Sequence, residues 1–278
     1  MKSFLILANT DKDVNLELSN KIADYLSQHN ASSVIISDMS IHYEGKYIRE
    51  EFLRGVEAVI VLGGDGTMLR AVHSLGDHGI PLLGINLGTL GFLTEVEESN
   101  VFHALDRLLC DDFMLEQRMM IEGRVKNHVY HALNDVVITR AGFSRIIGLN
   151  IYVNEQLLDT YEADGVIVAT PTGSTGYNLS AGGPIVSPKS KAIVVTPISP
   201  HSLTAKSVVF DSSDKIRIEI VKKRKTQDTE AIVSFDGENN MELAAGDMVT
   251  ATLSLRTVRL IKMYDVNFFS VLRDKIGG

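Results

Sequence analysis

One acidic residue stands in the middle of a glycine-rich loop of the kind that binds phosphate, where a carboxylate is unexpected. The loop Gly63-Gly64-Asp65-Gly66-Thr67 follows the apolar residues 59–62 and precedes the helical pattern of residues 68–72. Glycines let the backbone approach a ligand closely, and the free N–H groups at the start of a helix attract phosphate. A carboxylate at this point repels phosphate unless it accepts a proton or binds a metal ion. Asp65 therefore indicates catalysis at a phosphate, the alternative being a turn residue that caps its own backbone.

A second loop is crowded with hydroxyl groups. Residues 170–178 have the sequence TPTGSTGYN, follow the strand pattern of residues 166–169, and continue into the small residues 180–184. Serine and threonine hydroxyls can hydrogen-bond to ribose and phosphate oxygens, while the ring of Tyr177 can pack on a base. Because loops of this composition are also common without a ligand, this segment alone leaves both interpretations open.

Two polar side chains, Asn134 and Asp135, interrupt an otherwise apolar strand pattern over residues 132–139. Polar groups inside a sheet need hydrogen-bond partners, so the pair either ends the strand in a turn or binds a ligand such as a ribose diol or an exocyclic amine. A further carboxylate, Asp164, precedes the strand that leads to the hydroxyl-rich loop, and a turn is again the alternative.

The elements that must position these loops follow from the hydrophobic periodicity. In the first hundred residues, short apolar runs at 4–8, 33–37, 58–62 and 80–85 alternate with amphipathic stretches, of which residues 14–26 are the longest. This rhythm predicts a parallel sheet with helices on both faces, in which ligands gather beyond the carboxyl ends of the strands. Residues 100–109 predict another helix.

From about Met119 the pattern changes to short alternating strands, separated by turn-forming segments such as Asp236-Gly237. This change predicts a second, antiparallel β domain. Its expected strands cover residues 121–125, 132–139, 149–153, 165–169, 192–196, 215–220, 231–235, 249–255 and 258–263.

The composition excludes several classes of protein. No apolar run is long enough for a transmembrane helix, so no membrane partner is expected. The single cysteine, Cys110, rules out an internal disulfide and fits a reducing cytoplasm. With 27 basic and 35 acidic residues the net charge is −8, so no broad basic face is expected to attract nucleic acid, and anionic ligands must be held locally. The eight histidines lack metal-ligand spacing, so no metal fixed by protein ligands is expected.

With these loops in place, the chain resembles the NAD kinase family over essentially its whole length. The order and spacing of five segments match the family: residues 63–67, residues 84–92, Asn134-Asp135, Asp164-Gly165 and residues 170–178. The resemblance implies an α/β plus all-β protein. An N-terminal α/β Rossmann-like domain is expected over residues 1–112, with residues 264–278 returning to it, and a C-terminal β-sandwich-like domain carrying the NAD-binding loops over residues 113–263.

The resemblance also implies a reaction. A phosphoryl group is expected to pass from ATP, another nucleoside triphosphate or polyphosphate to the adenosine 2′-hydroxyl of NAD, with Asp65 as the general base. A divalent ion, Mg²⁺ or Mn²⁺, is expected to arrive on the donor phosphates. Family members are usually homodimers or homotetramers, and we expect the same of this chain.

The remaining site residues are assigned by the same resemblance. Gly66 and Arg70 look like contacts to the NAD or the triphosphate, Asn134 and Asp135 look like contacts to the adenine-side ribose, and Asp164 looks like a contact to the nicotinamide half. Eight others lie in or beside the matching segments and are expected to line the nucleotide site: Gly64, Thr67, Asn86, Thr172, Thr175, Gly176, Tyr177 and Ser180. Outside these segments, Arg145 is expected to reach a phosphate, and Ser199 with Pro200 is expected to close the pocket from a neighbouring subunit or loop.

Three positions depart from the family pattern. Asp135 stands where glutamate is usual, Glu162 where many members carry arginine, and Glu238 where glutamine is common; Arg145 could compensate for the missing arginine.

The sequence leaves two rival functions open. A lipid kinase could use a similar glycine loop, although the hydroxyl-rich loop suits a polar acceptor better. The second rival function is a non-catalytic NAD sensor, although a protein that only binds NAD gains nothing from a carboxylate that faces phosphate.

Overall fold

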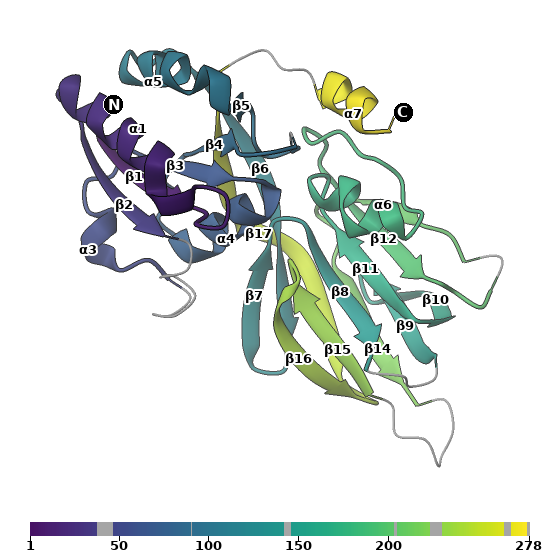
Figure 1. Ribbon diagram of the computed structural model, residues 1–278. Helices are drawn as coiled ribbons and strands as arrows, with labels where there is room; N and C mark the ends of the chain where they lie inside the picture. The colour runs from purple at the N-terminus through teal and green to yellow at the C-terminus, as the bar shows by residue number, and fades with distance from the viewer. Residues whose placement is uncertain are drawn as a thin grey trace. The chain divides into compact units, whose positions relative to one another are not determined.

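The computed structural model describes residues 1–37, 47–89, 91–141, 146–202, 205–222, 230–263 and 268–276. The chain divides into two compact units (Figure 1). The first unit consists of Met1–Gln117 and Val258–Gly278, and the second of Arg118–Thr257. The domain limits at residues 112 and 264 that the resemblance implies stay a prediction.

The first unit is built on the predicted parallel sheet. Its strands run in the order β2, β1, β3, β4, and the short β5 pairs with β4. Every residue of β3 is buried, as expected for a strand that is covered on both faces. The bounds are β1 Ser3–Ala8, β2 Ser32–Ser37, β3 Ala58–Gly63, β4 Leu82–Asn86 and β5 Val96–Glu97.

Helices connect and cover these strands, as the periodicity predicts. The helix expected at residues 14–26 begins as a 3₁₀ turn and continues as α1, and the one expected at 100–109 is α5. Ile22 of α1 and Leu105 of α5 are fully buried and belong to one core cluster with the strand residue Ile60. The bounds are α1 Glu17–Gln28, α3 Glu50–Leu53, α4 Asp65–Leu75, α5 Val101–Leu109 and α7 Phe268–Ile276. None of the described helices is both long enough and apolar enough to cross a membrane.

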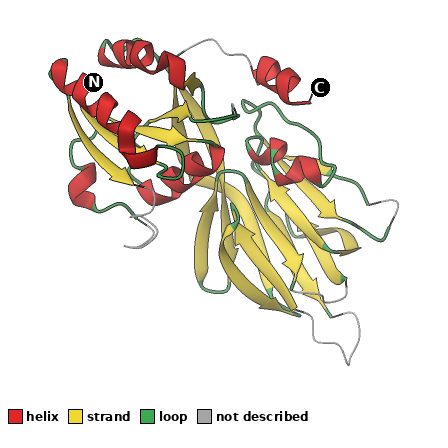
Figure 2. Cartoon of the chain, viewed as in Figure 1, coloured by secondary structure: helices red, strands yellow, loops and turns green. Residues whose placement is uncertain are grey.

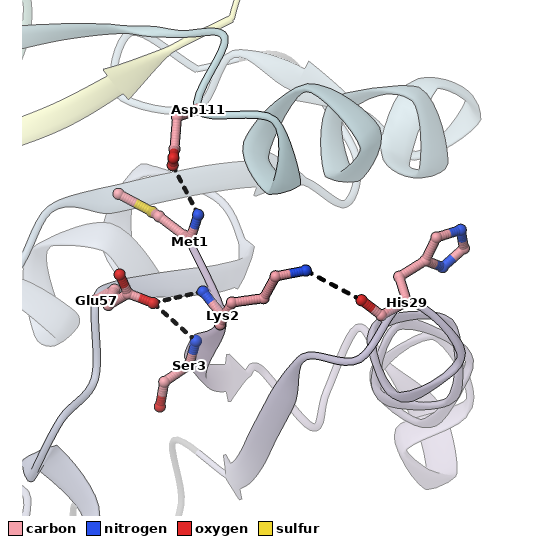
Figure 3. Close-up of polar contacts among 6 residues, drawn as sticks. All are labelled: Met1, Lys2, Ser3, His29, Glu57 and Asp111. Carbon is pink, nitrogen blue, oxygen red and sulfur yellow. Dashed lines mark hydrogen bonds and ion pairs between the residues drawn. The ribbon is translucent and has the colours of Figure 1, made fainter.

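The start of β1 is tied down by polar contacts (Figure 3). The N-terminal ammonium donates to Asp111 at 2.7 Å, and the Lys2 ammonium donates to the backbone carbonyl of His29 at 3.2 Å. The Glu57 carboxylate accepts the backbone N–H groups of Lys2 and Ser3. These contacts fix the register of the central strand β1 at its first residues.

The second unit is built mainly of strands and contains one short α-helix, α6 Tyr177–Ser180 (Figure 2). A six-stranded sheet has the order β13, β12, β11, β8, β15, β16, with all its pairs antiparallel. A second layer contains β10, β9, β14 and the first part of β17. Two strands, β6 Met114–Val125 and β17 Met248–Lys262, have residues in both units. The other bounds are β7 His128–Ala132, β8 Asp135–Arg140, β9 Ile147–Val153, β10 Gln156–Ala163, β11 Gly165–Ala169, β12 Ala192–Ile198, β13 Val208–Asp211, β14 Ile216–Val221, β15 Glu230–Phe235 and β16 Glu238–Ala244.

Side chains from both layers share one core. Val168 and Val233 of the six-stranded sheet lie in the same buried cluster as Leu149, Ile218 and Val249 of the other layer. The strand β14 alternates buried and half-buried residues, the pattern of a strand with one face on the core. Two antiparallel layers over one core make the β-sandwich-like domain that was expected.

The structure corrects the strand predictions at several places. The strand predicted at 132–139 covers the last residue of β7, the bend at residues 133–134 and most of β8. The strands predicted at 249–255 and 258–263 are the single long strand β17. Among the strands that were not predicted, β10, β13 and β16 lie at the ends of the two strand orders. An edge strand is partly exposed, so its sequence lacks the strong apolar alternation on which the predictions depend.

Candidate functional site

The glycine loop lies where the sequence predicts it, between a buried strand and a helix. β3 ends at Gly63, and α4 begins at Asp65 with Gly64 in the N-cap position. The Gly64 carbonyl accepts the backbone N–H groups of Thr67 and Met68 at 2.9 and 3.0 Å. A β-carbon built on Gly63 would lie 2.3 Å from Oγ1 of Thr67, so a larger residue cannot occupy this position without displacing α4.

Asp65 does not cap its own backbone. Its carboxylate accepts the backbone N–H groups of Phe92 at 2.8 Å and Leu93 at 3.0 Å, one on each oxygen. A β-carbon on Gly91 would lie 1.8 Å from Oδ1 of Asp65, which explains the glycine there. The carboxylate is thus held at the loop that follows β4, and each oxygen keeps a second lone pair for a further hydrogen bond.

Three predicted polar residues of the first unit make hydrogen bonds around this loop. Oγ1 of Thr67 accepts from Nδ2 of Asn9 at 3.1 Å and from Nη2 of Arg70 at 3.4 Å. Asn86 is buried at the end of β4, where its Nδ2 donates to the carbonyl of Gly88 at 2.5 Å. Thr67 and Asn86 therefore hold the two loops in shape, and Arg70 is half-buried beside the glycines.

Lys12 lies outside every motif of the sequence, yet the structure places it at the glycine loop. A β-carbon on Gly64 would lie 3.4 Å from its Nζ, and one on Gly88 would lie 3.5 Å from the same atom. The exposed ammonium group therefore lies against both glycine-containing loops of the first unit. Its only sequence signal is a basic residue shortly after a first strand, and many lysines share that position for no functional reason.

In the second unit, Asn134 lies in the bend between β7 and β8, and Asp135 is the first residue of β8, so the predicted strand is interrupted where these two polar residues stand. The Asp236 carboxylate accepts the backbone N–H groups of Leu133, Asn134 and Asp135 at 2.7, 2.7 and 3.0 Å. The sequence suggested only a hairpin turn at Asp236. The ligand contact expected of Asn134 and Asp135 stays a prediction.

The hydroxyl-rich loop is bonded directly to this bend. The Thr170 hydroxyl donates to the Leu133 carbonyl at 2.6 Å, and the Thr170 N–H donates to the Asn134 carbonyl at 2.8 Å. A β-carbon on Gly173 would lie 2.2 Å from the Asn134 carbonyl oxygen. The structure therefore brings two of the predicted segments together within the second unit.

The side chains of the hydroxyl-rich loop divide into two groups. Thr172 is buried and accepts from Nη1 of Arg118 at 3.2 Å, and the Thr175 hydroxyl donates to the Thr172 carbonyl at 3.3 Å. Gly176, Tyr177 and Ser180 are exposed, and Tyr177 keeps 44% of its surface open to solvent. The first group stiffens the loop, while the second is available to a ligand.

Asp135 is a buried acid without a cation beside it. Within the described residues its carboxyl accepts no hydrogen bond and forms no ion pair, and the residue is only 6% exposed. Burial, with a smaller contribution from the negative charge of Asp236, raises the pKa of Asp135 to about 7. A group in this state favours a ligand that can donate hydrogen bonds to it.

Asp164 and Ser199 lie apart from the hydroxyl-rich loop. Asp164 pairs with Arg140 at 2.8 Å and immediately precedes β11, whose other end leads to Thr170. β11 has five residues, so Asp164 and Thr170 are separated by a strand that is roughly 16 Å long. Gly165 pairs with Ile198, so Ser199 follows at the same end as Asp164. Arg145 lies outside the described residues.

Two family models match the chain, and their limits cover most of it. One is described as "ATP-NAD kinase N-terminal domain" and matches residues 4–113, and the other as "ATP-NAD kinase C-terminal domain" and matches residues 133–263. The chain belongs to the NAD kinase family. As a member of this family it is a kinase, that is, a phosphotransferase, and the resemblance seen in the sequence is confirmed.

Relatives and solved structures agree with this assignment. The NAD kinase of Lachnoclostridium phytofermentans is 46% identical, with 100% of this chain and 99% of that protein covered, and the NAD kinase of Agathobacter rectalis is 43% identical with the same coverage. Yeast NADH kinase complexed with NADH has a TM-score of 0.87 at 26% identity, covering 100% of this chain and 88% of that one. An NAD kinase from Archaeoglobus fulgidus in complex with ATP has a TM-score of 0.80 at 26% identity, covering 99% and 98%.

Within the described part of the chain, no group of three or more His, Cys, Asp or Glu side chains could hold a metal ion.

Proposed function

We propose that this chain transfers a phosphoryl group from ATP to the adenosine 2′-hydroxyl of NAD, with Mg²⁺ or Mn²⁺ bound to the donor phosphates. Membership of the NAD kinase family supports the acceptor, and the ATP complex of the similar Archaeoglobus fulgidus enzyme supports the donor. The observation that carries the proposal is the glycine loop at the start of α4, whose carboxylate Asp65 is held by two backbone amides. Polyphosphate is the alternative donor.

The donor phosphates bind at the start of α4 in this proposal. The backbone at Gly64 and Gly66 is open to an anion, and the helix start adds a positive dipole end. Arg70 supplies one cation from within the helix, and Lys12 supplies a second from across the loop. Because the whole chain carries a net charge of −8, this positive charge has to be local.

Asp65 is the general base. As the 2′-oxygen forms its bond to the γ-phosphorus, the bond from that phosphorus to the β,γ-bridging oxygen breaks, ADP leaves, and the hydroxyl proton passes to the carboxylate. The amides of Phe92 and Leu93 fix the carboxylate while leaving a lone pair on each oxygen. Fixed geometry is the larger part of the catalytic effect in a phosphoryl transfer with a loose transition state.

NAD binds through the second unit. Asn134 and Asp135 hydrogen-bond the adenine-side ribose, and the exposed Tyr177 packs on the base. Thr172 and Thr175 hold the loop whose exposed members, Gly176 and Ser180, line the nucleotide site. Asp164 meets the nicotinamide half and Arg145 a phosphate.

We infer a homodimer or homotetramer in the cytoplasm. Asp164 and Ser199 lie at the end of β11 away from the hydroxyl-rich loop, so a neighbouring subunit is a natural source for the groups that close each pocket. The lone Cys110 is exposed and free, which fits a reducing compartment.

The test is a coupled assay of NADP formation by the purified chain with NAD, Mg²⁺ and either ATP or polyphosphate. We expect NADP from the wild type and a loss of about 10²-fold to 10⁴-fold in kcat for Asp65→Asn, with NAD binding retained. Asp24→Asn, which changes an exposed carboxylate on α1, is the matched control and should keep the wild-type rate.

Two outcomes would contradict the proposal in different ways. No NADP from the wild type with either donor would refute the reaction itself. Wild-type turnover by Asp65→Asn would support the reaction but show that Asp65 is not its general base, and that Asp65 only holds residues 91–93 in place.

A further inference from the structure

Asp236 occupies a two-residue hairpin turn that does not need a negative charge. Phe235 of β15 pairs with Glu238 of β16, so only Asp236 and Gly237 connect the strands. Their φ angles are 51° and 76°, both in the left-handed region that a type I′ turn requires. Asn-Gly satisfies such a turn as well as Asp-Gly does, so the turn alone leaves the carboxylate unexplained.

The Asp236 carboxylate instead binds the bend that carries Asn134 and Asp135. Oδ2 accepts the N–H of Leu133 at 2.7 Å, and Oδ1 accepts those of Asn134 at 2.7 Å and Asp135 at 3.0 Å. The N–H of Asp236 donates back to the Asp135 carbonyl at 3.0 Å. Hydrogen bonds to an ionised acceptor are among the stronger ones, and here three consecutive amides share one carboxylate.

The opposite side of the same bend is held by Thr170. Its hydroxyl donates to the Leu133 carbonyl and accepts the N–H of Gly173 at 3.1 Å, while its own N–H donates to the Asn134 carbonyl. Leu133 and Thr170 are fully buried, so water cannot easily replace these bonds. The backbone N–H and carbonyl groups of the bend thus each have a fixed partner, and the direction of the Asn134 and Asp135 side chains follows.

We propose that Asp236 is a positioning residue of the NAD site, which holds Asn134 and Asp135 in the orientation that meets the ribose without touching the substrate itself. This inference rests on the proposed function, because it assumes that the two side chains contact NAD. A carboxylate is required because it offers acceptors on both oxygens. A carboxamide offers one, and its NH₂ group would face either the Leu133 amide or the Asn134 and Asp135 amides.

The test is Asp236→Asn, which keeps a favourable type I′ turn and removes one acceptor. We expect the KM for NAD to rise about tenfold or more, as when buried amides lose a charged acceptor, while the KM for ATP stays within about twofold. The matched control is Asp247→Asn. Asp247 also accepts a backbone N–H in a hairpin of the second unit, from Ala244 at 2.8 Å, but it does not contact the bend.

Thr170→Val supplies a second variant with nearly the same volume. It removes the hydroxyl that holds the other side of the bend, so it should raise the KM for NAD in the same way. If Asp236→Asn does not fold, Thr170→Val alone tests whether the contacts that hold the bend set the KM for NAD. An unchanged KM for NAD in Thr170→Val, and in Asp236→Asn where that folds, would reduce Asp236 to a turn residue and overturn the inference.

Failure of the proposed function would look different. If the wild type forms no NADP, the dissociation constant for NAD is measured by calorimetry without a donor, and the same variants are compared. A tenfold weakening in Asp236→Asn, with Asp247→Asn unchanged, would then support the positioning role although the reaction proposal had failed. A wild type that neither turns over nor binds NAD would overturn both.

Discussion

Two carboxylates of this chain lie beside backbone bends and have opposite surroundings. Asp65 receives two amide N–H groups on its oxygens, whereas the Asp135 carboxyl receives none within the described residues and is buried. The first arrangement fixes an acceptor in place. The second leaves an acid whose charged form is costly until a ligand donates hydrogen bonds to it. The same residue type therefore serves different purposes because the donors around it differ.

The raised pKa of Asp135 predicts a pH-dependent stability. Its pKa rises from 3.8 to about 7, so between these values the folded chain binds a proton that the unfolded chain has released. Stability should then fall as the pH rises through this window and level off above about 7, with this residue contributing at most about 4 kcal/mol. Asp135→Asn should remove that dependence. Urea unfolding of the wild type and the variant at pH 5 and pH 8 measures the free energy of unfolding at each pH. An equal change between the two pH values in both proteins would contradict the prediction.

At the scale of elements, the turn between β1 and α1 positions a cation. Asn9 donates its N–H to the Leu62 carbonyl at 3.0 Å and accepts the N–H of Lys12 at 3.1 Å. Asp13 accepts the N–H groups of Leu18 and Ser19 at the start of α1. The backbone of Lys12 is therefore held on both sides, while its exposed side chain can meet a ligand.

Replacing this cation should weaken donor binding. Lys12→Met keeps the length of the side chain and removes its charge, so we expect the KM for ATP to rise about fivefold to tenfold and the KM for NAD to stay within about twofold. Lys12→Arg should restore most of the affinity. Lys21→Met, at an exposed position on α1, is the control. Equal KM values for ATP in Lys12→Met and the control would exclude Lys12 from the phosphate site.

At the scale of the whole molecule, each unit depends on chain that is distant in sequence. The first unit includes Val258–Gly278, and Leu260 at the end of β17 pairs with Leu82 of β4. The N–H of Met263 donates to the buried Glu95 at 3.0 Å. The long strand β17 thus begins in one unit and ends in the other, so neither unit is a simple segment of the sequence.

Truncation after Thr257 should therefore destabilise the first unit. It removes Val258, Leu260, Ile261 and Met263, each at most 5% exposed, and burial of such side chains contributes about 1.5–3 kcal/mol each, together comparable with the stability of a domain. Truncation after Met263 keeps these four side chains and should retain a cooperative melting transition. Calorimetry of both fragments tests this, and a full-length melting profile for the chain truncated after Thr257 would show that the end of β17 contributes little to the first unit.

The sequence by itself determined the family, the parallel sheet, the antiparallel β domain and the strand, loop and helix around Asp65. These features depend on local periodicity and on motif residues at fixed spacing, which a linear pattern contains. The edge strands β10, β13 and β16 escaped prediction because an exposed edge does not require apolar alternation.

Only the tertiary structure decided which distant groups meet. Three contacts join residues that are far apart in the chain. Asp65 accepts the Phe92 and Leu93 amides, Asp236 accepts the amides of the bend at Asn134, and Lys12 lies against Gly64 and Gly88. Each meeting depends on strand register and on turn geometry, which are set by packing of the whole core. A short motif specifies which chemical groups are present, whereas the folded chain specifies which donor faces which acceptor.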